Sequence, residues 1–302
     1  MVLETIDQLV DIIRKSASPK RLAVAAAGDA HTLDAVVMAQ KEGLVAPQLF
    51  GDAAKITKIL VELGADVAKY EIIDAADDIA AAEAAVLSVH NGESDLLMKG
   101  MMQTGDIMRV VIDKEHGLLK EGATISLFTM SEMKHYHKLI VMTDSGIVRN
   151  PTLEQKKAIV ENAVRVLKAY GYTTPKVAAV CAVEVQNPKM PETIDAAKLA
   201  EMSKSGELAD CIVEGPLSMD MALSAEMTKY KGVESAVAGD PDVLLWPSVL
   251  VGNIAIKTAG CFGGIKKTVA FAVGAKAPIV LTSRGTDVEG KYLAILAAAA
   301  AS

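Results

Sequence analysis

Close to the C-terminal end, Ser283, Arg284 and Gly285 stand between a short apolar run and a segment with helical spacing. The guanidinium of Arg284 is a planar fork of donors that suits two oxygens of a phosphate or a carboxylate. Free N–H groups at the start of the following helix favour an anion at the same turn. A simpler alternative is that Thr286 or Asp287 only caps that helix and that the arginine points into water. These residue types predict an anion site, with phosphate as the first candidate.

A second stretch with the same layout begins at Lys99, directly after the apolar residues 96–98. It has a glycine, then the hydroxyl of Thr104 where a helix would start, and then the basic residue Arg109. Thr104 and nearby N–H groups could hold a phosphate oxygen, while the lysine and the arginine supply charge. The alternative is an ordinary capped helix whose basic side chains are solvated. Taken alone, this stretch decides nothing.

Histidine and cysteine patterns give little support for a metal site or a disulfide framework. His135 and His137 would lie on one face of a strand and could form half of a zinc site, but no third ligand follows at a suitable spacing. We therefore predict no metal. The odd number of cysteines, Cys181, Cys211 and Cys261, without a CxxC spacing indicates a reducing compartment and three small core side chains.

Hydrophobic periodicity predicts alternating strands and helices, which is typical of an α/β fold with parallel sheets covered by helices. In such sheets ligands bind where strands run into helices, so the two stretches above are suitably placed. We expect a first α/β domain from residues 1–130 with 275–302, and a second from residues 131–274. Strands are expected at 21–27, 45–50, 70–73, 96–98, 125–129, 139–143, 177–180, 211–213, 243–246, 268–273 and 278–281, and helices at 32–41, 52–63, 77–90, 152–169, 191–203, 219–227, 249–258 and from 288.

Composition restricts the possible functions further. The formal charge of −7 argues against a nucleic-acid-binding protein, because no basic stripe could neutralise a run of phosphates. The first 16 residues have amphipathic helical spacing with acidic residues rather than a signal peptide, and no apolar run is long enough to span a bilayer. We therefore expect a soluble, cytoplasmic protein with no nucleic-acid or membrane partner.

Six motifs in order along the chain resemble the phosphate acetyltransferase/phosphate butyryltransferase family. The likeness extends from about residue 20 to 295, and the Ser-Arg-Gly-Thr-Asp motif resembles the corresponding sequence of phosphate butyryltransferases in particular. The matching segments are 98–109, 143–146 with Asn150-Pro151, 214–220, Trp246-Pro247, Gly252-Asn253 and 283–285.

The resemblance implies two α/β domains with mainly parallel sheets that face each other across a cleft, as in the isocitrate/isopropylmalate dehydrogenase-like fold. It implies reversible transfer of a short-chain acyl group between coenzyme A and phosphate, with coenzyme A as a substrate, no permanently bound cofactor and a homodimer or higher homo-oligomer acting in fatty acid metabolism. By position, Ser283 would hydrogen-bond the acyl group and Arg284 would bind phosphate. Lys99, Thr104, Arg109, Asp144 and Gly285 fall in the family's substrate-binding and phosphate-binding motifs.

One residue departs from the family pattern. The acetyl enzymes carry an aspartate seven residues after the serine, proposed as the base for the thiol of coenzyme A, and this chain has Gly290 there. Asp287, Glu289, another group or water could take the proton. An unperturbed thiol has a pKa of about 8.5, so a modest base suffices.

The expected reaction is direct attack of the thiolate on the acyl phosphate in a ternary complex, because no obvious nucleophile stands beside a base in the sequence. Three alternatives stay open. The enzyme could prefer acetyl over butanoyl groups, the same fold could serve an NAD-dependent decarboxylating dehydrogenase, or the chain could bind anions without catalysis.

Overall fold

The computed structural model describes residues 2–16, 18–283 and 285–302 of the chain, which folds into two compact units. Unit 1 extends to Gln8 and includes Thr124–Thr268, and unit 2 consists of Leu9–Ala123 and Val269–Ser302. The division proposed from the sequence, 1–130 with 275–302 and 131–274, stays a prediction.

The sheet of unit 2 is parallel from β3 to β11, in the order β3-β2-β1-β4-β11. β1 and β4 consist mainly of buried residues, as expected for parallel strands covered on both faces. The strands are β1 (Lys20–Ala25), β2 (Val45–Gly51), β3 (Glu71–Asp74), β4 (Leu96–Lys99), β10 (Ile265–Val273), whose residues from Val269 belong to this unit, and β11 (Ile279–Val280). β10 pairs antiparallel with β11.

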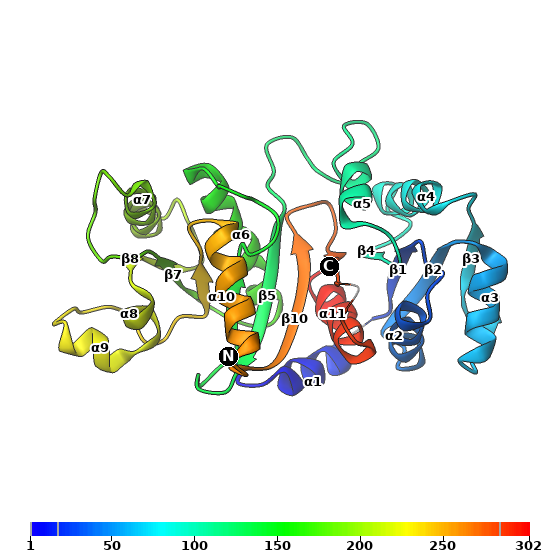
Figure 1. Ribbon diagram of the computed structural model, residues 1–302, viewed down its shortest axis with the longest axis horizontal. Coiled ribbons are helices and arrows are strands. Elements are labelled where there is room, and N and C mark those ends of the chain that lie inside the picture. Colours follow the sequence, from blue (N-terminus) through cyan, green and yellow to red (C-terminus); the bar gives the residue numbers. More distant parts are fainter. Residues whose placement is uncertain (1, 17, 284) are drawn as a thin grey trace. The chain divides into compact units, whose positions relative to one another are not determined.

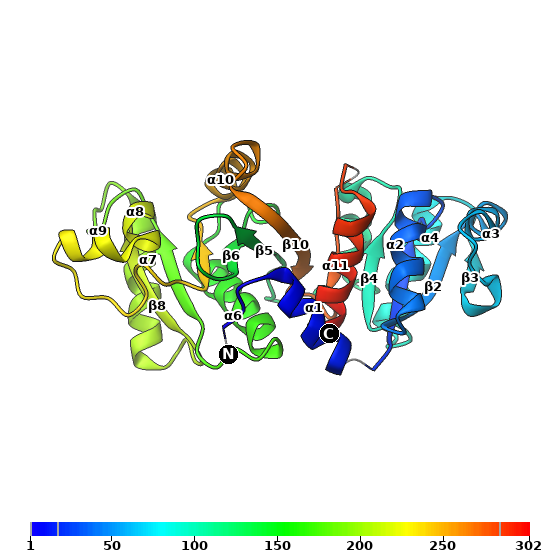
Figure 2. The same ribbon diagram turned by 90° about the horizontal axis from the view of Figure 1, so that it is seen from below.

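Helices cover both faces of this sheet: α4 and α5 lie on one side, and α2 and α11 on the other (Figure 1). α2 and α11 pack directly against each other and stand side by side in Figure 2. The helices are α1 (Ile6–Ser16), which crosses the boundary between the units, α2 (Ala30–Lys41), α3 (Ala53–Glu62), η1 (Val67–Lys69), α4 (Asp78–His90), α5 (Thr104–Val111) and α11 (Val288–Ala300).

Aspartate side chains define where several of these helices begin. Asp29, Asp52 and Asp77 each accept a hydrogen bond from a backbone N–H in the first turn of α2, α3 and α4. Each bond satisfies one of the N–H groups that a helix leaves without an internal partner.

Unit 1 has strands in the order β5-β6-β9-β7-β8, parallel except for the β5–β6 pair. The core includes Met142, Leu244 and Trp246. The strands are β5 (Ser126–Met133), β6 (Ile140–Thr143), β7 (Lys176–Val180), β8 (Ile212–Leu217) and β9 (Val243–Leu245). The helices are α6 (Leu153–Ala169), α7 (Pro191–Ser205), α8 (Met219–Leu223), α9 (Ala225–Tyr230) and α10 (Val249–Cys261).

The predicted α/β class with mainly parallel sheets is confirmed. The isocitrate/isopropylmalate dehydrogenase-like arrangement stays a prediction. Two local expectations are wrong: the helix expected at 219–227 is two helices separated at Ser224, and His135 and His137 lie in the turn between β5 and β6 rather than on a strand. Among residues 2–16, 18–283 and 285–302, no helix combines the length and apolarity that crossing a bilayer requires.

Candidate active site

Two neighbouring strands of unit 2 bring together segments that are far apart in the sequence. β4 and β11 are parallel, with Leu97 opposite Ile279 and Met98 opposite Val280. Both strands therefore end at the same edge of the sheet, and the residues that follow them leave side by side. In an open α/β sheet this edge is where ligands bind.

An open pocket of about 420 Å³ lies where these two segments meet. Of the residues predicted from the sequence, it brings together Lys99, Thr104 and Ser283. The complete lining consists of Lys99, Met102, Gln103, Thr104, Leu281, Thr282 and Ser283. It combines one ammonium group with three hydroxyl groups, which suits an anionic ligand with several oxygens.

Lys99 shapes the wall of this pocket as well as lining it. Its side chain is 3% exposed, and Nζ donates to the carbonyls of Gly100 and Met102, each at 3.1 Å. Gly100 lies so close to the end of β1 that a Cβ at this position would be 2.2 Å from the carbonyl oxygen of Ala26. Only a glycine fits there, so the lysine and the glycine together fix the turn that follows β4.

Thr104 is the first residue of α5 and is exposed. The preceding Gln103 makes no side-chain cap bond, so its side chain leaves the first N–H groups of α5 uncapped. Such groups, with the positive end of the helix dipole, favour an anion at this wall of the pocket.

The turn after β11 contains the other predicted residues. Ser283 is exposed, and its Oγ accepts a 3.3 Å hydrogen bond from the N–H of Gly285. Asp287 caps α11 by accepting from Gly290 N at 2.8 Å, which is the capping part of the simpler alternative from the sequence. Gly285, Asp287 and Glu289 are exposed and do not line the pocket. Arg284 lies outside the described residues.

Two of the predicted substrate-binding residues lie elsewhere. Arg109 is 76% exposed and pairs with Asp106 at 3.3 Å, and it does not line the pocket. Asp144 belongs to unit 1, is 2% exposed, and its carboxylate accepts from four backbone N–H groups. Those donors are the N–H groups of Leu127, Gly146, Ile147 and Val148. Asp144 thus holds the backbone of the turn after β6 in place.

Sequence reasoning missed Thr282 and Lys291. Thr282 lines the pocket next to Ser283, and its Oγ1 lies 3.2 Å from the Lys291 ammonium. Lys291 is 5% exposed, and burial lowers the pKa of its ammonium while the negative charge of Asp29 acts in the opposite direction. The available signal was a lysine in the first turn of a helix that is otherwise apolar from Tyr292 onward.

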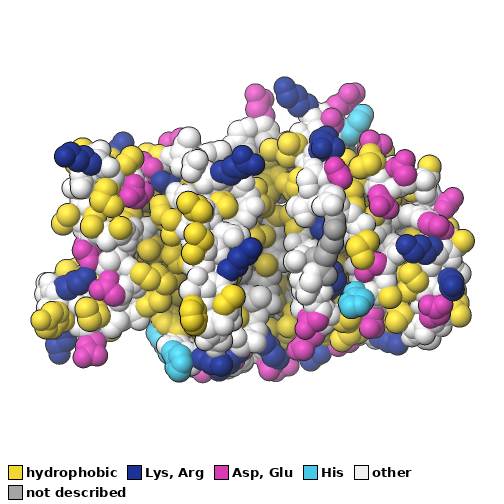
Figure 3. Space-filling model, in the orientation of Figure 1, with side chains coloured by type: hydrophobic (Ala, Val, Ile, Leu, Met, Phe, Trp, Pro, Cys, Tyr) yellow, Lys and Arg dark blue, Asp and Glu magenta, His cyan; other side chains and the backbone are white. Residues whose placement is uncertain are grey.

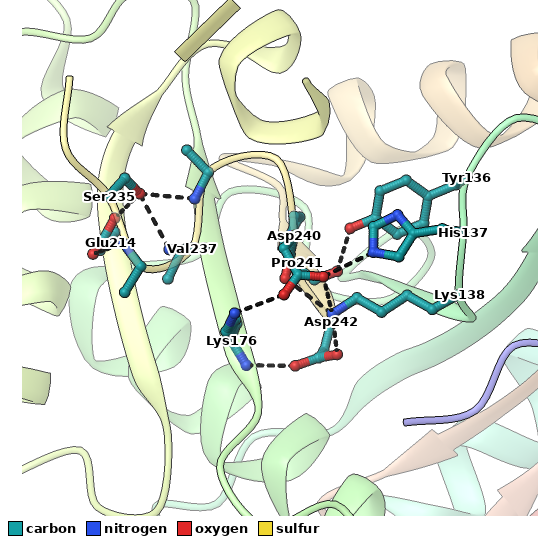
Figure 4. Close-up of polar contacts among 12 residues, drawn as sticks. Tyr136, His137, Lys138, Lys176, Glu214, Ser235, Val237, Asp240, Pro241 and Asp242 are labelled. Carbon is teal, nitrogen blue, oxygen red and sulfur yellow. Dashed lines mark hydrogen bonds and ion pairs between the residues drawn. The ribbon is translucent and has the colours of Figure 1, made fainter. Parts of the chain in front are cut away.

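The histidine segment in unit 1 belongs to an ion-pair network. His137 contacts Asp240 at 2.8 Å, and Lys138 donates to Asp242 at 2.7 Å (Figure 4). Burial raises the pKa of Asp240, but hydrogen bonds from Lys176, Lys138 and His137 outweigh it and hold that pKa below its ordinary value. Within the described part of the chain, no three His, Cys, Asp or Glu side chains gather as a metal site.

The cysteines are free. Cys181 and Cys211 are buried as expected, and burial raises the pKa of each thiol to about 11. The expectation that Cys261 is a core residue is wrong, because it is exposed at the end of α10.

Comparison with known proteins gives matches over nearly the whole chain. The family described as "Phosphate acetyl/butaryl transferase" matches residues 79–299. A phosphate acetyltransferase of Thermotoga maritima is 40% identical over 290 residues, covering 96% of this chain and 97% of that protein. A phosphate butyryltransferase of Clostridium acetobutylicum is 41% identical over 285 residues, covering 94% of both. The crystal structure of a branched-chain phosphotransacylase from Enterococcus faecalis V583 aligns with a TM-score of 0.80 at 29% identity, covering 93% of this chain and 98% of that one.

Proposed function

The chain belongs to the phosphate acetyl/butaryl transferase family, and we propose that it transfers a short-chain acyl group reversibly between coenzyme A and inorganic phosphate. The preferred reaction in this proposal is butanoyl-CoA + phosphate = butanoyl phosphate + CoA. Coenzyme A is a substrate, and no cofactor is held permanently. Family membership favours a transferase over the NAD-dependent dehydrogenase considered from the sequence.

The observation that carries the proposal is the pocket at the shared edge of β4 and β11. Lys99, Thr104 and Ser283 line it together, although they come from two distant segments of the chain. An ammonium group and several hydroxyls suit the phosphate group that either arrives or leaves in this reaction. In the proposal, Arg284 adds its guanidinium to the phosphate, and Ser283 donates to the carbonyl oxygen of the acyl group.

In the direction toward acyl-CoA, the thiol loses its proton, and the thiolate attacks the acyl-phosphate carbonyl and expels phosphate. Alignment of the two substrates and donors for the developing oxyanion are what the protein contributes. We propose direct transfer in a ternary complex. The raised pKa values of Cys181 and Cys211 support this, because buried neutral thiols are poor nucleophiles.

Asp287 and Glu289 remain the proposed acceptors for the thiol proton. Both are exposed at the start of α11, and the carboxylate of Asp287 also caps that helix. A Cβ at Gly290 would lie 2.8 Å from Thr286 Cγ2 and 3.0 Å from Asp287 Oδ1. An aspartate at position 290 would thus need both side chains to shift, which supports placing the base at another residue.

Butanoyl preference over acetyl is the finer part of the proposal. Relatives named for either activity match at 40% and 41% identity, so identity does not separate them. Each methylene in an acyl pocket changes discrimination by about 1 to 3 kcal/mol. Phosphate-dependent release of free thiol from butanoyl-CoA and from acetyl-CoA measures the difference. We expect higher kcat/KM with butanoyl-CoA, and the opposite order would assign the enzyme as an acetyltransferase.

The same assay tests the non-catalytic alternative. Binding of inorganic phosphate without any thiol release from butanoyl-CoA, acetyl-CoA or a branched acyl-CoA would refute the acyltransferase proposal. Arsenate in place of phosphate gives an acyl arsenate that hydrolyses, so continuous thiol release in arsenate would confirm the transfer step independently of product build-up.

We also propose a homo-oligomer, in a cytoplasmic location. Hydrophobic side chains gather over α10 on the face shown in Figure 3, and Leu250 and Ile254 of that helix are 68% and 57% exposed. Apolar side chains exposed together on one helix are typical of a surface that associates. Light scattering of the purified chain tests this, with Ile254→Glu expected to shift the mass toward the monomer and an unshifted mass contradicting this surface.

A further inference from the structure

Lys291 is a buried cation in a helix whose other inward residues are apolar. Its side chain is 5% exposed, and Tyr292, Leu293 and Ala294 after it are also buried. Burial of an ammonium is costly unless it is compensated, and the lowered pKa of Lys291 reflects that cost. A methionine would fill the same space without this penalty, so a packing role does not account for the lysine.

The hydrogen bond of Lys291 fixes how Thr282 can be used. An ammonium group has three donors and no acceptor, so the hydroxyl of Thr282 must accept from Lys291. The single proton of that hydroxyl is then directed to another acceptor. Among the described residues, Lys291 is the only recorded hydrogen-bond partner of the Thr282 hydroxyl. Thr282 lines the pocket, so an acceptor supplied by a ligand can take this proton.

Among the described residues of unit 2, no carboxylate forms an ion pair with Lys291. Asp29 at the start of α2 acts on it through its charge, and one oxygen of Asp29 has no hydrogen-bond partner among the described residues. β11 carries only Ile279 and Val280. The other titratable groups on packed elements are Lys99 at the end of β4, the Arg14–Glu42 pair that contacts the Tyr292 hydroxyl, and the exposed Asp287 and Glu289 on α11 itself. α2 also carries His31, Asp34 and Lys41.

We propose that Thr282 is a substrate-binding residue that donates a hydrogen bond to the phosphate group, and that Lys291 is a positioning residue behind it. Lys291 holds the hydroxyl as a donor toward the pocket and places a positive charge on the far side of it. The inference deepens the proposed acyltransferase function and rests on it. The ligand chemistry is an oxyanion with phosphate geometry, either inorganic phosphate or the phosphoryl end of an acyl phosphate.

The test uses four variants of the full chain. Thr282→Val removes the hydroxyl at nearly constant volume, Thr282→Ser keeps it, and Lys291→Met removes the charge. Thr32→Val is the matched control, because Thr32 is buried in the same unit, its hydroxyl has no partner among the described residues, and it does not line the pocket. Binding of inorganic phosphate is measured by calorimetry, and KM for phosphate and for acyl-CoA by thiol release.

Thr282→Val is expected to raise Kd and KM for phosphate by roughly tenfold to a hundredfold, the range for losing a hydrogen bond to a charged group. Lys291→Met is expected to raise them by about tenfold, since the hydroxyl can then turn away. Thr282→Ser should stay within about threefold of the wild type, and Thr32→Val should match it. KM for acyl-CoA should change less than KM for phosphate in every variant.

A pH series of the calorimetry separates this role from a structural one. Above pH 8 phosphate is a constant dianion, so a further loss of affinity in the wild type reports loss of the Lys291 proton, whose pKa is lowered. The affinity of Lys291→Met should lack this decline. Melting temperatures should show that all four variants remain folded.

Phosphate affinity within twofold of the wild type in Thr282→Val or in Lys291→Met would overturn the inference. A loss of kcat at saturating substrates in Lys291→Met with unchanged phosphate affinity would also overturn it. That result would mean that Lys291 acts in proton transfer rather than in phosphate binding. A wild-type protein that binds no phosphate and releases no thiol would refute the proposed function itself, which distinguishes the two failures.

Discussion

Replacing Gly100 with alanine is expected to destabilise unit 2 and to damage the pocket, whereas the same change at Gly105 is expected to stabilise it. A Cβ at Gly100 would lie 2.2 Å from the carbonyl oxygen of Ala26 and 2.8 Å from that of Ala25. Because carbon contacts are favourable at about 3.5 to 4.0 Å, the backbone must move by roughly 1 Å. No atom lies within 4 Å of a Cβ at Gly105, in the first turn of α5.

The movement threatens two backbone hydrogen bonds, Gly100 N to Ala25 O at 2.8 Å and Met101 N to Ala26 O at 3.1 Å. Overpacking costs about 1 to 3 kcal/mol, and each weakened hydrogen bond adds about 1 kcal/mol. We therefore expect Gly100→Ala to lower the free energy of unfolding by at least about 2 kcal/mol. Gly105→Ala should raise it by about 0.5 to 1 kcal/mol, since alanine is the better helix former.

Urea unfolding of both variants and the wild type measures this pair, and thiol release reports on the pocket. Lys99 anchors the carbonyls of Gly100 and Met102, so turnover should fall in Gly100→Ala together with stability. Equal unfolding free energies for the two alanine variants, within about 0.5 kcal/mol, would show that the turn after β4 does not require glycine.

Further predictions concern the site and unit 1. Arg284→Ala should lower kcat by about a hundredfold or more, the usual effect of deleting a charge-stabilising donor, and near-normal turnover would remove Arg284 from the mechanism. Cys261→Ala should leave turnover unchanged; complete inactivity of a folded variant would instead favour an acyl-enzyme. Asp242→Ala should destabilise unit 1 by about 1 to 3 kcal/mol in urea unfolding, because Lys138 keeps its ion pair with Asp240 but loses Asp242, and the N–H of Lys176 loses its acceptor. The folded-state pKa of Asp240 is lowered, so its stabilisation is present above its unfolded pKa and is lost as the pH falls below about 4. Asp240→Asn should therefore reduce the free energy of unfolding at pH 7 and weaken its dependence on pH in acid. Parallel curves of unfolding free energy against pH for the variant and the wild type would contradict the assignment.

Local signals in the sequence predicted the helix starts well. The helix predicted at 152–169 does begin at this point, because Thr152 forms a complete capping box with Gln155 at the start of α6. Such bonds span three residues, so the pattern that predicts them is continuous in the chain. Ser224 divides the expected helix 219–227 because its own side chain caps α9 by accepting from Met227 N. A serine within an apolar run gives this signal only weakly.

Side-chain partners in space were harder to predict. Arg109 follows the right motif, yet its position on α5 turns it to Asp106 and solvent rather than into the pocket. Lys291 was missed because its burial depends on the packing of α11 against α2, which no local pattern encodes. The meeting of Lys99 with Ser283 requires the β4–β11 pairing, which joins segments about 180 residues apart. The family resemblance pointed to both segments, and their pairing places Lys99 and Ser283 around one pocket.

Unit 2 is formed from two separate stretches of the chain, 9–123 and 269–302, so its strands are not all synthesised together. β11 leaves the ribosome after all the strands of unit 1, so a nascent chain that has passed residue 268 still lacks β11 and the turn after it, which contains Thr282 and Ser283. Until then, the β4 edge has no β11 beside it, and open strand edges invite pairing with other chains. Products that stop before residue 279 would thus lack the pocket and also expose the β4 edge to pairing with other chains. We therefore expect interrupted translation to cause aggregation in addition to the loss of enzyme.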